Sequence, residues 1–332
     1  MATQNVFAPT GFSLTELTAA INGLPHKPTQ LGDSGLFSYD GVTTLSMQIE
    51  RQDAVLSLVP TSPRGAPGKP IGRDTRNSRS FILPHLQLED AVRADEVQGV
   101  RLFGTENQLT PFQTRLMRVM QLGVDRLDYT MEFQRVGALK GIVYDSDGST
   151  VLFNLFTEFG VSQTTANMTL SSATTNIRVE VDKWTNTIDD LLGGIGYEGL
   201  DVWCGRTAWQ SLVSHKSYLE TFAASPDVGK MRAPVGNVIE FGGATWHKYR
   251  GRANSAAMIA DAEMYVVPRG VSDLFIGRFG PADYEDTVNT MGLPMYAQGL
   301  RMRNGKGWDI EMQSNPIHLC TRPDAVIKIT VN

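Results

Sequence analysis

The chain has 332 residues and a formal net charge of -5 at pH 7, with 41% hydrophobic and 20% charged residues. No apolar run approaches the roughly 18 residues of a membrane-spanning helix, and no basic segment leads into an apolar one at the start, which excludes a membrane protein and a secretory signal. Two cysteines, Cys204 and Cys320, are too few for a disulfide framework and indicate a reducing compartment. We therefore expect an intracellular globular protein of about two domains.

The first predicted element is a short helix after Ser13. Ser13 and Glu16 have the spacing of a capping box, and Asn22-Gly23 ends the segment. Its apolar stripe consists of Leu14, Leu17 and Ile21. Eight or nine residues do not hold a helix alone in water, so we expect this stripe to dock on another surface, the alternative being a frayed terminus.

A long hairpin with a basic tip follows. Apolar residues alternate with polar ones from Val42 to Glu50, a second apolar run covers residues 55–59, and a return run begins at Phe81. Glycines and prolines prevent regular structure in the stretch between the two arms. Residues 64–79 contain one acid and five basic residues, Arg64, Lys69, Arg73, Arg76 and Arg79. This stretch carries net +4 in an acidic protein, and the hairpin places it at its tip.

Helices are predicted next. Residues 88–104 fit a short helix, and residues 112–138 fit a helix of about 40 Å that Thr110 caps, with Pro111 in its first turn. The short segment carries four acids, Glu89, Asp90, Asp95 and Glu96. Such acids are far more often a solvated face than a catalytic group. Residues 142–153 then fit a hairpin that turns at Asp147-Gly148.

The middle of the chain, residues 160–270, reads as a separate α/β unit. An amphipathic helix with apolar residues from Ile177 to Leu191 ends at Gly193-Gly194, a buried strand covers 201–205, and helical sequence follows through residue 222.

The C-terminal part returns to strands. Apolar and polar residues alternate over 300–303 and 308–313, and Asn304-Gly305 between them is typical of a two-residue turn. We instead predict a three-residue loop over 304–306, with Gly305 or Lys306 left-handed, because it pairs Met302 with Trp308 and Arg301 with Asp309. Residues 325–331 are predicted to form the last strand.

Several short motifs resemble cofactor, phosphate or metal sites, but the residues and elements around them do not fit such a site. Gly194–Gly199 matches G-x-G-x-x-G, but a helix precedes it and a strand follows, the reverse of a dinucleotide site. In the basic stretch, Pro70 stands where a phosphate loop needs Ser or Thr. His318 and Cys320 make two ligands at most, which is too few for zinc. We expect no enzyme, cofactor or metal site.

Five ordered segments together resemble one family. They are LPHKPTQLGDSGLFSYDGVTTLSMQIE, LSLVPTSPRGAPG, PHLQLEDAVRADEVQGVRLFG, NTMGLPMYAQ and EMQSNPIHLCTRPDAVIKI. The chain thereby resembles the lambda-type major capsid proteins of tailed bacteriophages, the capsid protein E family. The resemblance covers about residues 20–150 and 265–332.

The resemblance implies an α+β Hong Kong 97-type capsid shell fold. Its expected parts are an N-terminal arm (1–42), an extended loop hairpin (43–86), a peripheral domain with the spine helix (87–158 and 275–316) and an axial domain (159–274 and 317–332). The implied function is a major capsid protein that assembles into hexamers and pentamers of an icosahedral shell around phage DNA. The expected location is the virion capsid, with the host cytoplasm during assembly.

The implied partners are further copies of the chain, a scaffolding protein, a decoration protein and the portal, with double-stranded DNA enclosed but not read by sequence. In this setting we predict that the stripe of Leu14, Leu17 and Ile21 docks on a neighbouring subunit. We also predict that the basic loop pairs with the four acids of an adjacent copy, without covalent crosslinks. The alternatives are a nucleic-acid-binding module that uses residues 64–79 and an enzyme with an unrecognised site.

Overall fold

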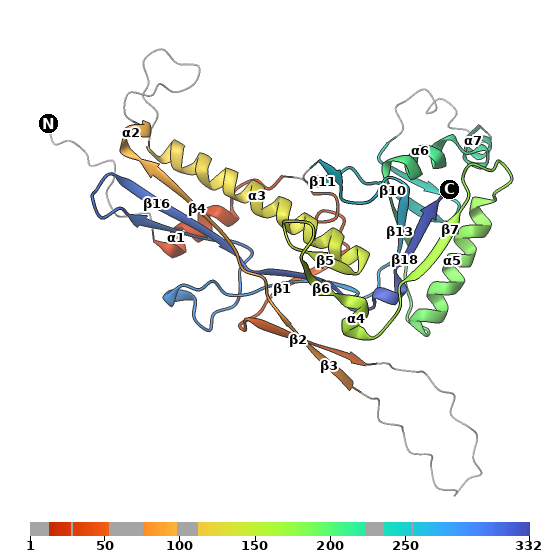
Figure 1. Ribbon diagram of the computed structural model, residues 1–332, viewed down its shortest axis with the longest axis horizontal. Coiled ribbons are helices and arrows are strands. Elements are labelled where there is room, and N and C mark those ends of the chain that lie inside the picture. Colours follow the sequence, from red (N-terminus) through yellow and green to blue (C-terminus); the bar gives the residue numbers. More distant parts are fainter. Residues whose placement is uncertain (1–12, 28, 53–75, 98–111, 224–235, 254) are drawn as a thin grey trace, which may run out of the picture.

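The structure is a computed structural model that describes residues 13–27, 29–52, 76–97, 112–223, 236–253 and 255–332. It is an elongated α+β molecule (Figure 1). The long helix α3 (Phe112–Lys140) runs along one half, a six-stranded sheet with helices forms the other half, and the hairpin of β2 (Ser46–Gln52) and β3 (Arg76–Ile82) projects from one side.

Helix α3 is the predicted spine. Its buried side chains recur at three- and four-residue steps, which places one continuous apolar face against the sheet below. Gly123 lies in the middle, where a Cβ would sit 2.2 Å from Sδ of Met312, so the glycine lets this flexible side chain pack closely against the helix. The predicted cap Thr110 and Pro111 lie outside the described residues.

The sheet under α3 corrects one prediction. Its strands, in order, are β15 (Tyr296–Arg301), β16 (Gly307–Ser314) and β4 (Leu86–Arg93). The helix predicted at 88–104 is therefore wrong for 88–93, and only α2 (Ala94–Val97) is helical among the described residues of that segment. Pairing along the whole of β16 overrides the local helical propensity of β4.

The turn between β15 and β16 corrects a second prediction. Arg301 pairs with Trp308 and Leu300 with Asp309, which is the register that the sequence analysis rejected. On the buried face, Gly299 stands opposite Ile310, and the small residue leaves room for Leu17. Leu300 is consequently 54% exposed. The predicted left-handed glycine is confirmed, with φ of +68° at Gly305.

Helix α1 (Leu14–Asn22) packs within its own chain. Ser13 caps it as predicted, accepting a hydrogen bond from the backbone N–H of Glu16 at 3.3 Å. The whole predicted stripe is buried, with exposures of 8%, 3% and 0% for Leu14, Leu17 and Ile21. Leu17 and Ile21 belong to the core shared by α3, β15 and β16, and the backbone N–H of Ala297 donates to Oγ1 of Thr18 at 3.3 Å. The stripe thus has an intrachain partner, and its docking on a neighbouring subunit stays a prediction.

A second region joins the two halves. A three-stranded sheet has the order β1 (Phe37–Gly41), β14 (Phe275–Phe279) and β17 (Pro316–Cys320).

After α3, β5 (Ile142–Tyr144) and β6 (Val151–Asn154) form the predicted hairpin, whose turn contains Gly148 at φ +72°. The carboxylate of Asp147 accepts four hydrogen bonds from Ser149 and Thr150, which hold its pKa well below the usual value. Helix α4 (Leu155–Phe159) follows.

The other half is the predicted α/β unit. Its sheet has the order β7 (Thr164–Met168), β18 (Ile327–Val331), β13 (Glu263–Arg269), β8 (Gly199–Cys204), β10 (Ala244–Lys248) and β9 (Val238–Phe241). Its helices are α5 (Ile177–Leu192), α6 (Arg206–Ser214) and α7 (Lys216–Ala223). Helix α5 ends at Gly193 with φ +63°, so the G-x-G-x-x-G segment is a helix stop and turn, as predicted. The remaining elements are β11 (Arg252–Ala253), β12 (Ala256–Ala257), η2 (Glu285–Thr287) and η3 (Pro323–Ala325).

Candidate functional site

The basic hairpin is the first candidate surface. Arg64, Lys69 and Arg73 lie outside the described residues, whereas Arg76 and Arg79 lie on β3. Arg79 is exposed, and its Nε donates to the backbone carbonyl of Glu158 at 2.8 Å. This contact holds the guanidinium group of Arg79 beside α4 while the residue stays at the surface.

An aromatic cluster anchors the hairpin to the body. Phe81 is 2% exposed, and its ring lies 5.6 Å from that of Phe153 and 5.9 Å from that of Phe159. Leu45 and Ile82, at the base of the hairpin, are 66% and 73% exposed. One side of the hairpin base is therefore packed, and the other offers apolar side chains at the surface.

The four predicted acids do not form one helical face. Glu89 and Asp90 lie on β4, and Asp95 and Glu96 lie on α2. Glu96 already pairs with Arg115 of α3 at 2.8 Å. Asp90 accepts a hydrogen bond from the backbone N–H of Ala91 at 2.8 Å.

Glu89 instead forms an acidic pair that the sequence analysis missed. It stands directly opposite Glu311 of β16, and Nε2 of Gln87 donates to both carboxylates, at 3.1 and 3.0 Å. Nε2 of Gln313 donates to Glu311 at 2.5 Å and to Asp283 at 2.6 Å. Like charges directly across a sheet repel each other, so this face favours a cationic partner. The alternation of Asp309 and Glu311 with apolar residues was the available signal for an acidic strand face. The pairing of this strand with β4 joins residues far apart in the chain, so the sequence alone did not predict it.

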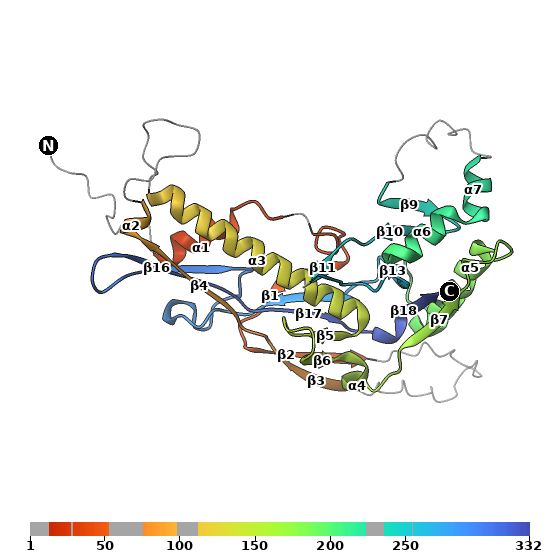
Figure 2. The same ribbon diagram turned by 45° about the horizontal axis from the view of Figure 1, so that its top comes forward.

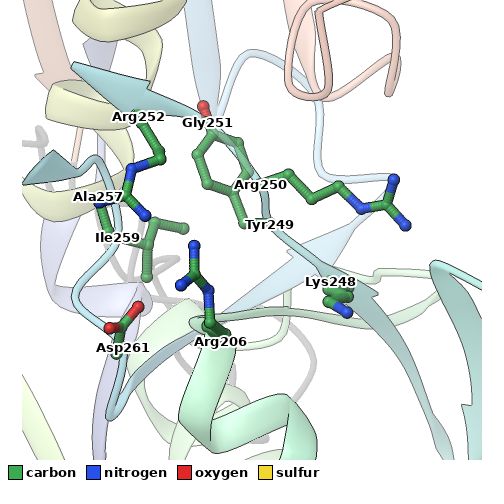
Figure 3. Close-up of a pocket in the computed structure, with 9 residues that line it drawn as sticks. All are labelled: Arg206, Lys248, Tyr249, Arg250, Gly251, Arg252, Ala257, Ile259 and Asp261. Carbon is green, nitrogen blue, oxygen red and sulfur yellow. The ribbon is translucent and has the colours of Figure 1, made fainter. Parts of the chain in front are cut away.

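A basic pocket of about 270 Å³ lies where α6, β10 and β11 meet (Figure 3). Its lining has four basic residues and one acid: Arg206, Lys248, Arg250, Arg252 and Asp261. Figure 3 shows the guanidinium groups of Arg206 and Arg252 pointing into the pocket, whereas Arg250 points away and donates to Oδ1 of Asn237. This surplus of positive charge suits an anion.

A buried polar network connects the segments around this pocket. Glu132 of α3 accepts hydrogen bonds from the backbone N–H groups of Leu31 and Gly32, at 2.8 and 3.2 Å, and from the hydroxyl of Tyr249, at 3.1 Å. It also pairs with Arg135 at 3.3 Å. This environment and burial raise the pKa of Tyr249 far above its usual range, so the phenol stays protonated.

Both cysteines and His318, residue types that are catalytic in many enzymes, are buried in the described part of the chain. Burial raises the pKa of both thiols, Cys204 and Cys320, and lowers that of His318 well below its usual value. Among the described residues, no cluster of His, Cys, Asp and Glu suits a metal ion, and no helix is both long and apolar enough for a membrane span.

Comparison with known proteins identifies the family. The family model of phage major capsid protein E matches residues 13–331. The chain is 26% identical to the major capsid protein of Pseudomonas phage KPP10 over 340 residues, and 23% identical to that of Salmonella phage Felix O1 over 354 residues. Each alignment covers 96% of this chain and 96% of the relative.

Solved structures agree on the fold. A putative capsid protein from a prophage of E. coli CFT073 matches with a TM-score of 0.61 at 11% identity, covering 96% of this chain and 99% of that one. The capsid of cyanophage P-SCSP1u matches with a TM-score of 0.52 at 13% identity, over 93% and 90% of the chains. The expected α+β capsid shell fold is confirmed. The chain therefore belongs to the phage major capsid protein E family and is a structural protein of the virion capsid, not an enzyme.

Proposed function

We propose that copies of this chain tile an icosahedral shell as hexamers and pentamers, and that the basic hairpin of each copy lies over the acidic β4–β16 face of a neighbour. The observation that carries this proposal is the hairpin itself, which projects from the body with Arg76 and Arg79 on β3 (Figure 1). The complementary feature is the pair Glu89 and Glu311, which lack a cation partner among the described residues.

In this arrangement the chain divides into the parts that the resemblance implies. The arm comprises 1–42, the extended loop 43–86, the peripheral domain 87–158 and 275–316, and the axial domain 159–274 and 317–332. The compact α/β unit around the six-stranded sheet supports the axial domain, and α3 with the β15–β16–β4 sheet supports the peripheral domain.

Further partners complete the proposal. A separate scaffolding protein guides assembly in the host cytoplasm, a portal occupies one vertex, and a decoration protein reinforces a shell that is held without covalent crosslinks. Each exposed ion pair of the hairpin contributes only about 0–1 kcal/mol, so the clamp acts by repetition over many copies. Arginine outnumbers lysine in the tip, which suits bidentate pairing with carboxylates.

Charge reversal tests the clamp. Replacing Arg73, Arg76 and Arg79 by Glu is expected to abolish shell assembly with the cognate scaffold, because the hairpin would then repel the acidic face. Electron microscopy and sedimentation measure the yield of closed shells. A matched variant reverses three exposed arginines elsewhere, Arg178, Arg301 and Arg303, and is expected to assemble.

The reciprocal variant identifies the partner. Adding Glu89→Lys and Glu311→Lys to the reversed hairpin is expected to restore shells, because the signs are then exchanged on both sides. Shells that fail to return would remove the β4–β16 face from the proposal. A wild-type hairpin that binds duplex DNA, with binding lost in the reversed variant, would instead favour the nucleic-acid-binding alternative.

A further inference from the structure

A second basic feature lies on α3, away from the hairpin. Arg118, Leu122, Arg126 and Tyr129 follow one another at four-, four- and three-residue steps, so they share one edge of the helix. All four are exposed, with 47% for Leu122 and 49% for Tyr129. From Arg118 to Arg126 this edge is about 12 Å long.

The edge continues into the basic pocket. The hydroxyl of Tyr129 donates to the backbone carbonyl of Arg252, which joins α3 to β11. Gln30 holds the adjoining backbone from the other side, with Nε2 donating to the carbonyl of Lys248 at 2.8 Å and Oε1 accepting from the N–H of Arg250 at 2.5 Å. The pocket is therefore held in place before any ligand arrives, and Arg206 and Arg252 point into it (Figure 3).

The charges of this surface are unbalanced. Among the described residues, no acidic side chain forms an ion pair with Arg118, Arg126 or Arg206. The acid beside Arg126 on α3, Asp125, pairs with Lys27 at 2.6 Å, which leaves Asp261 at the pocket edge as the nearby counter-charge. A surplus of arginines on one face of an acidic chain attracts a polyanion.

The elements that carry this surface and the hairpin lie on different sides of the molecule. Both views place α3 and β11 on the side of the molecule away from β2 and β3 (Figure 2). If the hairpin clamps neighbouring copies, its side of the subunit is committed to shell contacts. The side of α3 is then free to meet the enclosed nucleic acid.

We propose that the spine stripe, defined as Arg118, Arg126, Arg206 and Arg252, binds the phosphate backbone of the enclosed double-stranded DNA without reading its sequence. The feature that favours phosphate contact over base readout is that the stripe consists of four exposed arginines on separate elements, α3, α6 and β11, whose guanidinium groups can meet spaced phosphates. Four phosphate contacts per subunit bind weakly and exchange, which is compatible with DNA that must move during packaging and ejection.

Salt dependence tests this proposal on the purified full-length subunit. With a fluorescent 20-bp duplex of random sequence, the slope of log K against log[NaCl] is expected to be roughly -3 to -4, since each neutralised phosphate contributes about -0.9. The Arg126→Gln/Arg252→Gln variant is expected to reduce that slope by about 2 and to weaken binding at low salt.

The control and the contrary outcomes are as follows. Arg178→Gln/Arg301→Gln removes the same charge elsewhere and is expected to leave DNA binding unchanged, with circular dichroism reporting that both variants are folded. Equal weakening in this control, no wild-type binding at 25 mM NaCl, or loss only on mutating the hairpin arginines would overturn the proposal. So would tighter binding of polyglutamate than of a duplex of equal charge, which would indicate an acidic protein partner. The stripe variant is also tested for shell assembly, which depends on the hairpin clamp and not on the stripe, so the two proposals can fail separately.

Discussion

Replacing Glu132 by alanine is expected to destabilise the folded subunit by about 3–5 kcal/mol, because it removes the carboxylate partner of the buried Arg135 and the acceptor of three donors, two of them buried. The side chains of Glu132 and Arg135 are only 7% and 9% exposed. Urea unfolding of the isolated subunit, followed by tryptophan fluorescence, measures the loss as a shift of the midpoint at constant slope.

Two further variants separate charge pairing from packing. Replacing both Glu132 and Arg135 by methionine is expected to cost less than the single alanine, since no uncompensated charge then remains and only the three donors lose their acceptor. The exposed pair of Glu180 and Lys183, 2.8 Å apart on α5, provides the control, and Glu180→Ala is expected to cost about 0.5 kcal/mol or less. A single Glu132→Ala variant as stable as this control would contradict the assigned role.

The Glu132 network also explains how distant segments meet. The chain near Leu31 and Gly32, the spine helix and Tyr249 share one carboxylate as acceptor. A Cβ at position 32 would sit 2.1 Å from Oγ1 of Thr29 and 2.9 Å from Nη1 of Arg135, so glycine at this position allows the close approach without moving either side chain. The network therefore joins the segment around Leu31 to α3 and to the chain that follows β10.

The periodic spacing of apolar residues predicted the helices that bury one face along their length. Helices α3 and α5 each present one apolar face with a 3.6-residue repeat, and that repeat is a local property of the sequence. The capping Ser13 of α1 and the stop at Gly193 of α5 are local as well. These features could be predicted because neighbouring residues determine them.

The candidate surfaces depend on pairing between residues far apart in the chain. Strand β4 carries consecutive acids, Glu89 and Asp90, which break the alternation expected of a strand, and its partner β16 lies more than 200 residues away. The register of β15 depends on α1, which fills the space above Gly299. The acids were therefore predicted, but the pairing of Glu89 with Glu311 was not.

Replacing Leu17 by aspartate is expected to destabilise the isolated subunit by at least about 4 kcal/mol, because the stripe of α1 is part of the chain's own core. Leu17 is 3% exposed, and its removal from that core forfeits about 1.5–3 kcal/mol of apolar burial. The buried carboxylate adds several kcal/mol more, since the described members of that cluster are apolar.

The same variant distinguishes an intrachain role from an intersubunit one. Thr15→Asp, on the exposed face of α1, is the matched control, and it is expected to leave stability within about 0.5 kcal/mol, since an acid in the first turn of a helix is tolerated. Unfolding curves of the free subunits are compared first, and shell yields with scaffold afterwards. If Leu17→Asp unfolds like the wild type yet fails to assemble, the stripe contacts a neighbouring subunit after all. If both stability and assembly are lost while Thr15→Asp keeps both, α1 acts by completing the subunit, and the hairpin remains the part of the chain that reaches the neighbour.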